Sequence, residues 1–200
     1  MRQILVRIAL IFFAFFLVSE SKAQCNNTLT TAWTSNNGQS GIMFAINAKN
    51  SIVIDSFDIN WDIGTYGYQI YYKPGTFVGF QVTPAAWTLI GSGSATSAGI
   101  GNATNLSASL NQVLNRYETG SFYITTTTGT PCNYTNGGNA CDSLMGNADL
   151  TLTEGYGKAY PFAATFISRE YSGRVYYHCL PSPNYVITSP PLCNISAGQI

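Results

Sequence analysis

Five cysteines and one histidine are the residues of this sequence with the clearest capacity for chemistry. Structural zinc sites use four Cys or His ligands, commonly in close pairs separated by two to four residues. Eight residues separate Cys132 from Cys141, and no C-x-x-C redox motif occurs. We therefore expect disulfides of an exported chain rather than a metal or redox centre. The cysteines are Cys25, Cys132, Cys141, Cys179 and Cys193, and the histidine is His178.

Two disulfide pairings follow from the positions of the cysteines. Cys132 and Cys141 flank the turn "NYTNGGNA", whose glycines can bend the chain back so that the two sulfurs meet. Cys179 and Cys193 would pin the proline-rich end of the chain to the last predicted strand. Spacing does not prove connectivity. Cys25 is left over in this scheme, either free, bonded to a partner, or bonded to the tail in place of one of these pairs.

Catalytic groupings find little support. A Ser–His–Asp or Cys–His arrangement would have to use His178, but "VYYHC" (175–179) is typical of a strand that ends at its histidine. Glycosidase chemistry needs two paired carboxylates, and we predict no enzyme and no catalytic residues. One structural calcium ion is physically reasonable, but no D-x-D-x-D-G loop is present and no metal ligand is assigned. Asp55, Asp58 and Asp62 are close in sequence, whereas Glu118, Asp149, Glu154 and Glu170 are scattered along the chain.

Aromatic side chains provide the best binding hypothesis. Flat rings can stack on sugar rings while Asn and Asp side chains bind the hydroxyls. Alternation along the strand places Tyr71 on the face opposite Tyr66, Tyr68 and Tyr72, so one set belongs to the core. The alternative is that these rings only fill or border a sandwich, since isolated exposed aromatics are ordinary. The candidate ligand contacts are Trp61, Trp87, Tyr66 and Tyr71.

The N-terminal segment is typical of a secretory signal. Arg2 and Arg7 precede an apolar run over residues 8–18, and small residues near Ala23 predict cleavage after it. The apolar run is too short to cross the ~30 Å core of a bilayer, although a retained anchor is an alternative. We expect a signal peptide over 1–23 and a secreted mature chain without a transmembrane span.

The charge of the mature chain argues against nucleic-acid partners. Without residues 1–23, six basic and eight acidic side chains remain, with no basic cluster to neutralise phosphates. Thr, Ser, Asn, Gly and Tyr are abundant instead. Such a composition is typical of an exported β-protein whose surface is polar without being charged.

Short alternating runs separated by turn residues predict an all-β fold. About eight strands are expected, in an antiparallel β-sandwich of jelly-roll type. A change of phase at Asp55–Ser56 is what a β-bulge would produce, and an irregular strand would produce it too. We expect one domain over 24–178, followed by a Cys/Pro-rich tail over 179–200. The predicted strands are 41–48, 51–61, 67–73, 86–96, 104–111, 120–128, 148–155 and 173–179.

The motifs "IYYKPGT", "FYITTTTG" and "YPF" resemble those of a β-sandwich module in secreted or surface multidomain proteins of Bacteroidetes and other environmental bacteria. The resemblance covers roughly residues 33–177, and the cysteines of the 132–141 loop depart from it. It implies an extracellular accessory or adhesive module and supplies no catalytic residues. We therefore expect a non-catalytic adhesion or protein-interaction module, whose partner is a surface protein. The alternative is a carbohydrate-binding module that uses exposed Trp and Tyr to hold an extracellular glycan.

Overall fold

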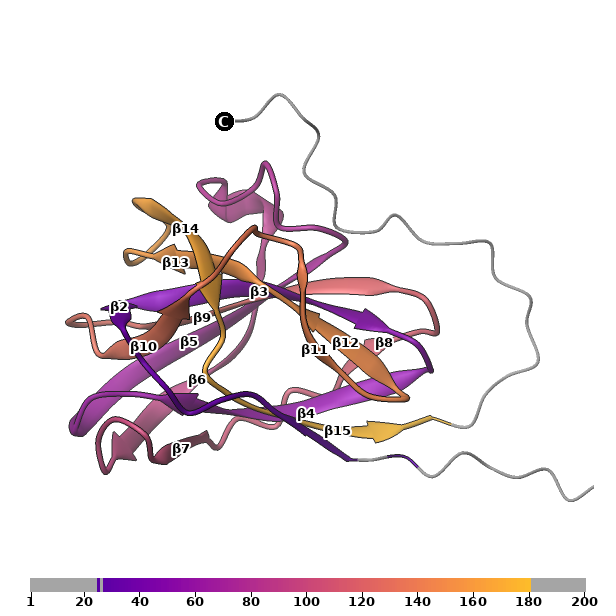
Figure 1. The fold of residues 1–200 in the computed structure, drawn as a ribbon, viewed down its shortest axis with the longest axis horizontal. Coiled ribbons are helices and arrows are strands. Elements are labelled where there is room, and N and C mark those ends of the chain that lie inside the picture. Colours follow the sequence, from indigo (N-terminus) through magenta and orange to yellow (C-terminus); the bar gives the residue numbers. More distant parts are fainter. Residues whose placement is uncertain (1–24, 26, 181–200) are drawn as a thin grey trace, which may run out of the picture.

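The chain folds into short β-strands that form two stacked sheets (Figure 1). The computed structural model describes Cys25 and residues 27–180. No α-helix occurs in this part of the chain, so no helix there is long and apolar enough to cross a membrane. The elements are β1 (Thr28–Thr30), β2 (Asn37–Gln39), β3 (Gly41–Ala48), β4 (Ile52–Asn60), β5 (Gly64–Pro74), the 3-10 turn η1 (Pro84–Ala86), β6 (Thr88–Ser97), β7 (Ala103–Leu106), β8 (Gln112–Leu114), β9 (Thr119–Thr126), β10 (Cys132–Asn136), β11 (Ser143–Gly146), β12 (Leu150–Thr153), β13 (Gly155–Lys158), β14 (Thr165–Glu170) and β15 (Gly173–Cys179).

Both sheets are antiparallel. The small sheet has the order β1-β15-β4-β7, and β8 also pairs with β4. The large sheet has the order β2-β10-β14-β13-β3-β9-β5-β6, and the β11–β12 hairpin joins it through β3. The predicted all-β antiparallel sandwich is confirmed, with more strands than the eight expected. The predicted signal peptide and residues 181–200 of the predicted tail lie outside the described residues.

The two sheets enclose an aromatic core that follows from alternation along the strands. In β3, Ile42, Phe44 and Ile46 point between the sheets, where all three are buried. The Phe44 ring lies 5.7 Å from that of Phe57 on β4 and 4.5 Å from that of Tyr171, measured between centroids. Edge-to-face and offset-stacked contacts of this kind add to the free energy gained from burial alone.

The change of phase in β4 corresponds to a register shift. Tyr176 of β15 faces Ser56, while the next residue, Tyr177, faces Ile54. Asp55 is therefore the extra residue of a bulge, which is one of the two alternatives that the sequence left open. Both halves of β4 consequently keep their apolar side chains turned toward the core.

The strands that the sequence did not predict are short and polar. β10 lies in the segment expected to form a tight turn between two cysteines, yet it pairs with β2 and β14. Its composition resembles that of a loop, and only these neighbouring strands make it extended. Local pattern could not reveal it because the pairing partners come from distant parts of the chain.

The close approach of β13 to β3 gives a test of the large sheet. A Cβ added at Gly155 would lie 1.7 Å from the Met43 carbonyl oxygen, whereas one at Gly138 would meet nothing closer than 4.0 Å. We expect Gly155→Ala to lower the free energy of unfolding by about 3 kcal/mol, because β3 is central and cannot move away. Gly138→Ala should change it by less than about 0.5 kcal/mol. Urea unfolding of the two variants measures the difference, and equal effects would contradict this packing.

Candidate functional site

The large sheet carries a second apolar cluster on its outer face. Met43 and Ala45 of β3 alternate with the core residues and point away from the small sheet, where Tyr123 of β9 joins them. The 75–87 loop and the 159–164 turn lie over these strands. We call this group the outer cluster, and its buried members are Met43, Ala45, Phe77, Trp87, Tyr123, Ala140, Tyr156 and Phe162.

Aromatic contacts hold the 75–87 loop on the outer cluster. The Trp87 indole Nε1–H donates to the Phe80 carbonyl oxygen over 2.9 Å, which closes the loop on itself. The Phe162 ring lies 4.9 Å from Tyr123 and 5.0 Å from Tyr71. Burial raises the pKa of the Tyr123 hydroxyl, so this ring stays neutral within the cluster.

Exposed apolar side chains rim one end of this cluster, beside β5 and β6. Leu89 pairs with Tyr71 across the two strands. Tyr160 lies close enough to Tyr71 to raise the pKa of its hydroxyl, although burial is the larger cause. Lys73 places its ammonium 4.1 Å from the centre of the Phe80 ring, and burial lowers the pKa of this lysine. We call this rim the outer patch. It consists of Val82, Leu89, Phe80 and Tyr160, which are 64%, 48%, 39% and 37% exposed, and the half-buried Tyr71.

The structure separates the four aromatics that the sequence proposed as ligand contacts. Trp61 is completely buried between the sheets, so its prediction as a ligand contact is wrong. Trp87 is only 7% exposed and supports the loop. Tyr66 packs edge-on against Trp61 and donates its hydroxyl to the Ile63 carbonyl oxygen. Tyr71 alone reaches the outer patch, on the face opposite Tyr66 as alternation predicted.

The predicted disulfide pairings are wrong. Cys25 is bonded to Cys179, and Cys132 is a free thiol that is 1% exposed. Cys141 is disulfide-bonded, although not to Cys132. The physical reason is β10, which extends the chain after Cys132 where a turn was expected. Cys193 lies outside the described residues, but Cys179 already has its partner.

Burial makes the Cys132 thiol unreactive. It faces Trp61 in an isolated β-bridge, between the two sheets. Desolvation raises its pKa far above the ordinary value, and the nearby Asp62 carboxylate raises it further. A thiol needs to ionise to act as a nucleophile or metal ligand. Cys132 is therefore a core residue.

The register of the first and last strands explains the Cys25–Cys179 bond. Thr28 of β1 faces Tyr176 of β15, so the residue three positions before Thr28 lies opposite the residue three positions after Tyr176. Those residues are Cys25 and Cys179, whose Cα atoms are 5.7 Å apart. The positions of the cysteines in the sequence predict this bond only if the pairing of β1 with β15 is already known.

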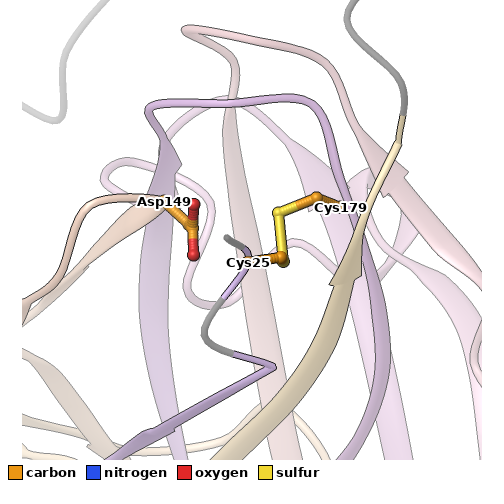
Figure 2. A group of neighbouring side chains, drawn as sticks. All are labelled: Cys25, Asp149 and Cys179. Carbon is orange, nitrogen blue, oxygen red and sulfur yellow. A yellow bond between two sulfur atoms is a disulfide. The ribbon is translucent and has the colours of Figure 1, made fainter. Parts of the chain in front are cut away.

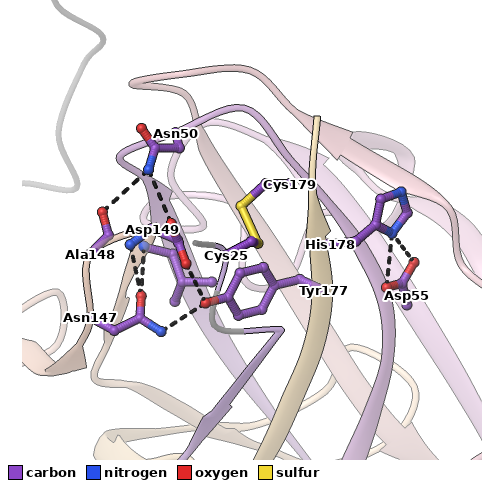
Figure 3. The surroundings of a disulfide bond; sticks show 10 residues. Cys25, Asn50, Asp55, Asn147, Ala148, Asp149, Tyr177, His178 and Cys179 are labelled. Carbon is purple, nitrogen blue, oxygen red and sulfur yellow. Dashed lines mark hydrogen bonds and ion pairs between the residues drawn. A yellow bond between two sulfur atoms is a disulfide. The ribbon is translucent and has the colours of Figure 1, made fainter. Parts of the chain in front are cut away.

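A buried carboxylate lies beside this disulfide (Figure 2). Asp149 accepts hydrogen bonds from the Tyr177 hydroxyl at 2.9 Å and from the Asn50 amide at 3.0 Å (Figure 3). Asn147 donates to the same Tyr177 hydroxyl at 2.8 Å. Burial raises the pKa of Tyr177, and the hydrogen bond that its hydroxyl donates to Asp149 raises it further. The network keeps Tyr177 protonated and ties the β11–β12 hairpin to β15.

The disulfide removes the metal-binding capacity of this group. The sulfurs of Cys25 and Cys179 and a carboxylate oxygen of Asp149 lie within 4.8 Å of one another. A thiophilic cation would require both sulfurs as thiolates. Because the two sulfurs are bonded to each other (Figures 2 and 3), the group serves as a covalent closure of the sandwich.

The other titratable residues named from the sequence have separate partners. The His178 Nδ1 atom lies 2.9 and 3.0 Å from the two carboxylate oxygens of Asp55, because the bulge places Asp55 beside it (Figure 3). Asp58 accepts from Asn105 and Tyr176 at 2.8 Å each. Asp62 accepts from the Asn133 amide at 2.9 Å. Each of the three neighbouring carboxylates is thus engaged in a different cross-strand contact.

The class of the protein follows from its fold and this surface. It is an antiparallel β-sandwich with a covalently joined first and last strand and an apolar cluster on the outside of its larger sheet. The Cys25–Cys179 disulfide is compatible with an extracellular location. No protein-family model and no curated protein matches the chain.

The disulfide predicts that replacing its two cysteines has non-additive effects on the free energy of unfolding. Cys25→Ser, Cys179→Ser and the double variant should each lower the free energy of unfolding by about 3–5 kcal/mol, since each removes the same bond across 154 residues. The loss in the double variant should match that in either single variant. Chemical unfolding of oxidised protein measures it, and additive losses would show that the two cysteines are not bonded.

Lys158 predicts a pH dependence. Its side chain is completely buried, its Nζ donates to the Ala163 carbonyl at 2.6 Å, and burial lowers its pKa to about 8. Between pH 8 and 9.5 the unfolded chain keeps a proton that folded Lys158 has lost, so this residue should raise the free energy of unfolding by about 1–2 kcal/mol over that range. The raised pKa values of Cys132 and the buried tyrosines act in the opposite direction, because these groups ionise first in the unfolded chain. The change in the free energy of unfolding from pH 8 to 9.5 should therefore be lower by about 1–2 kcal/mol in Lys158→Met than in the wild type, and unaltered in the exposed control Lys49→Met. Urea unfolding across this range decides, and equal pH slopes in Lys158→Met and the wild type would contradict the assignment.

Proposed function

We propose that this protein is an exported, non-catalytic module that binds a surface protein through the outer patch. The observation that carries the proposal is the gathering of exposed apolar side chains over a rigid aromatic base. Scattered exposed apolar residues need no explanation, but a grouped set is typical of an interaction surface. The resemblance to surface modules of environmental bacteria supports the same conclusion.

The base makes the patch suitable for binding. The Trp87–Phe80 hydrogen bond fixes the loop that carries Phe80 and Val82, and β5–β6 pairing fixes Leu89. Side chains held in place before binding lose little conformational entropy when the complex forms. Large apolar anchors of this kind dominate the binding energy of protein interfaces.

The charge around the patch favours a partner with an apolar surface. Lys73 is a cation of this region, and its ammonium lies over the Phe80 ring. Loop residues 81–87 contain no charged side chain. Charge steering would therefore contribute little to association, and the interaction should depend only weakly on salt.

A carbohydrate ligand is the second candidate. Tyr71 is half-buried and Tyr160 is 37% exposed, so each could offer a ring face to a sugar. The burial of Trp61 and Trp87 argues against the planar row of exposed tryptophans that would favour this reading. A protein partner is thus the better supported proposal.

Binding to cell surfaces tests the patch. Val82→Asp combined with Leu89→Asp should reduce retention on producing cells at least about tenfold. In the complex each new carboxylate would be buried, and it would lose its hydration without gaining a hydrogen-bond or ion-pair partner. Val113→Asp, which alters an exposed apolar residue of the small sheet, is the matched control and should bind like the wild type. Retention that survives the patch variant would contradict the proposal.

Two treatments separate the candidate partners. Protease digestion of the cells should abolish retention if the partner is a protein. Retention on purified polysaccharide, lost in Tyr71→Ala combined with Tyr160→Ala, would favour the carbohydrate candidate instead.

A further inference from the structure

Strand β6 ends the large sheet and has one open edge. It spans Thr88–Ser97 and is the last strand in the order of that sheet, so β5 pairs with one of its two edges. Among the described residues, no backbone hydrogen bond joins β6 to a strand other than β5. Ser92, Gly93, Ser94 and Thr96 are exposed. The open edge therefore offers its N–H and C=O groups to another strand.

The hydrogen bonds of β5 show which residues of β6 face the open edge. The Thr127 N–H donates to the Gly67 carbonyl oxygen over 2.9 Å, so Gly67 directs its backbone groups toward β9 and away from β6. Backbone groups alternate along a strand, so Tyr68 directs its own groups toward β6, where it pairs with Gly93. The groups left for the open edge belong to the neighbours of Gly93 and to every second residue beyond them, which are Ser92, Ser94 and Thr96.

These three residues form a neutral row of hydroxyl side chains on the outer face of the sheet. The Thr96 hydroxyl lies 2.8 Å from that of Thr65, and Ser92 pairs with Gln69, which accepts a hydrogen bond from the Tyr71 hydroxyl of the outer patch. Charged residues and prolines commonly keep an exposed edge from pairing, and β6 contains neither. Nothing in the composition of this edge thus opposes a further strand.

We propose that β6 pairs with β6 of a second copy of this chain, antiparallel and in a register centred on Ser94. Ser94 then lies opposite the partner's Ser94, and Ser92 lies opposite the partner's Thr96. Each of these pairs exchanges two backbone hydrogen bonds. The register shift between β5 and β6 falls at Ile90, outside the paired segment. The product is a two-fold dimer in which the two large sheets form one continuous sheet.

The edge is complementary to itself, which makes a second copy its occupant. In a two-fold contact each residue meets its own counterpart or a residue equally far from the axis, so a charged side chain near the axis would face its like. Like charges directly opposite each other destabilise a strand pair, and residues 88–98 contain none. The side chains that meet are serines and threonines, which form hydrogen bonds across strands.

The dimer places both outer patches on the same face. The two-fold axis of an antiparallel strand pair is perpendicular to the sheet, so the outer faces of the two copies coincide. Leu89 is five residues from Ser94, which puts each patch about 17 Å from the axis along its strand. Two patches side by side bind a partner bivalently. This consequence rests on the proposed function, whereas the dimer itself rests on β6.

Disulfide trapping in the full chain tests the register. Ser94→Cys places two thiols opposite each other with Cα atoms about 5.5 Å apart, a distance that a disulfide spans. Ser92→Cys is the matched control, because the two copies of residue 92 are separated by about 14 Å along the strands. Oxidation of the native protein should cross-link Ser94→Cys at least about tenfold faster than Ser92→Cys. Equal rates would overturn the proposal.

Charge exchange tests the occupant. In sedimentation equilibrium the wild type should form a concentration-dependent dimer. Ser94→Lys and Ser94→Glu should each raise its dissociation constant at least about tenfold, because like charges meet at the axis, and mixing the two variants should restore a 1:1 dimer. Thr28→Lys, the same change on the exposed edge strand of the small sheet, is the control and should dimerise like the wild type.

Two results would contradict the dimer. One is a wild type that stays monomeric, and the other is a Ser94→Lys variant that dimerises as the wild type does. Cell retention of the Val82→Asp and Leu89→Asp variant is a separate measurement, so failure of the dimer and failure of the outer patch are distinguishable.

Discussion

The burial of β3 on both of its faces is the constraint on which the rest of the structure depends. Its even-numbered residues enter the aromatic core between the sheets, and Met43 and Ala45 enter the outer cluster. A strand buried on both sides needs cover on both sides. The small sheet covers one face, and the 75–87 loop with the 159–164 turn covers the other. The outer patch exists because that second cover is made of loops and leaves its rim exposed.

The covalent closure of the sandwich lies at the edge of the small sheet, where the first strand is weakly held. β1 is only three residues long and pairs with β15 alone. So short an edge strand has few ladder hydrogen bonds to hold it. The Cys25–Cys179 bond and the Asp149–Tyr177 network reinforce this end, which brings distant parts of the chain together. The cysteines and the buried carboxylate at this end of the sandwich thus stabilise the fold.

The sequence predicted the long strands well and the short ones poorly. The expected strand at 41–48 matches β3, because alternation of apolar side chains is strong there. The change of phase at Asp55–Ser56 marked the place of the register shift, and the structure decided that it is a bulge. β10 was missed and a turn was expected in its place, so the pairing of Cys132 with Cys141 was wrong. Among the candidate ligand contacts, alternation assigned Tyr66 and Tyr71 to opposite faces correctly. It could not show that Trp61 is buried, because burial depends on what packs against the other side.

The sequence by itself determined the β-class of the fold, the face on which each side chain of a long strand lies, and the preference for disulfides over metal ligation. These are local properties that follow from side-chain period and residue type. Only the tertiary structure decided which cysteines meet and which aromatics remain exposed. Both outcomes depend on the register between strands far apart in the chain, such as β1 with β15, and on loops that fold back over a sheet. No local pattern encodes which distant strands pair or where these loops lie, because both are set by the packing of the whole sandwich.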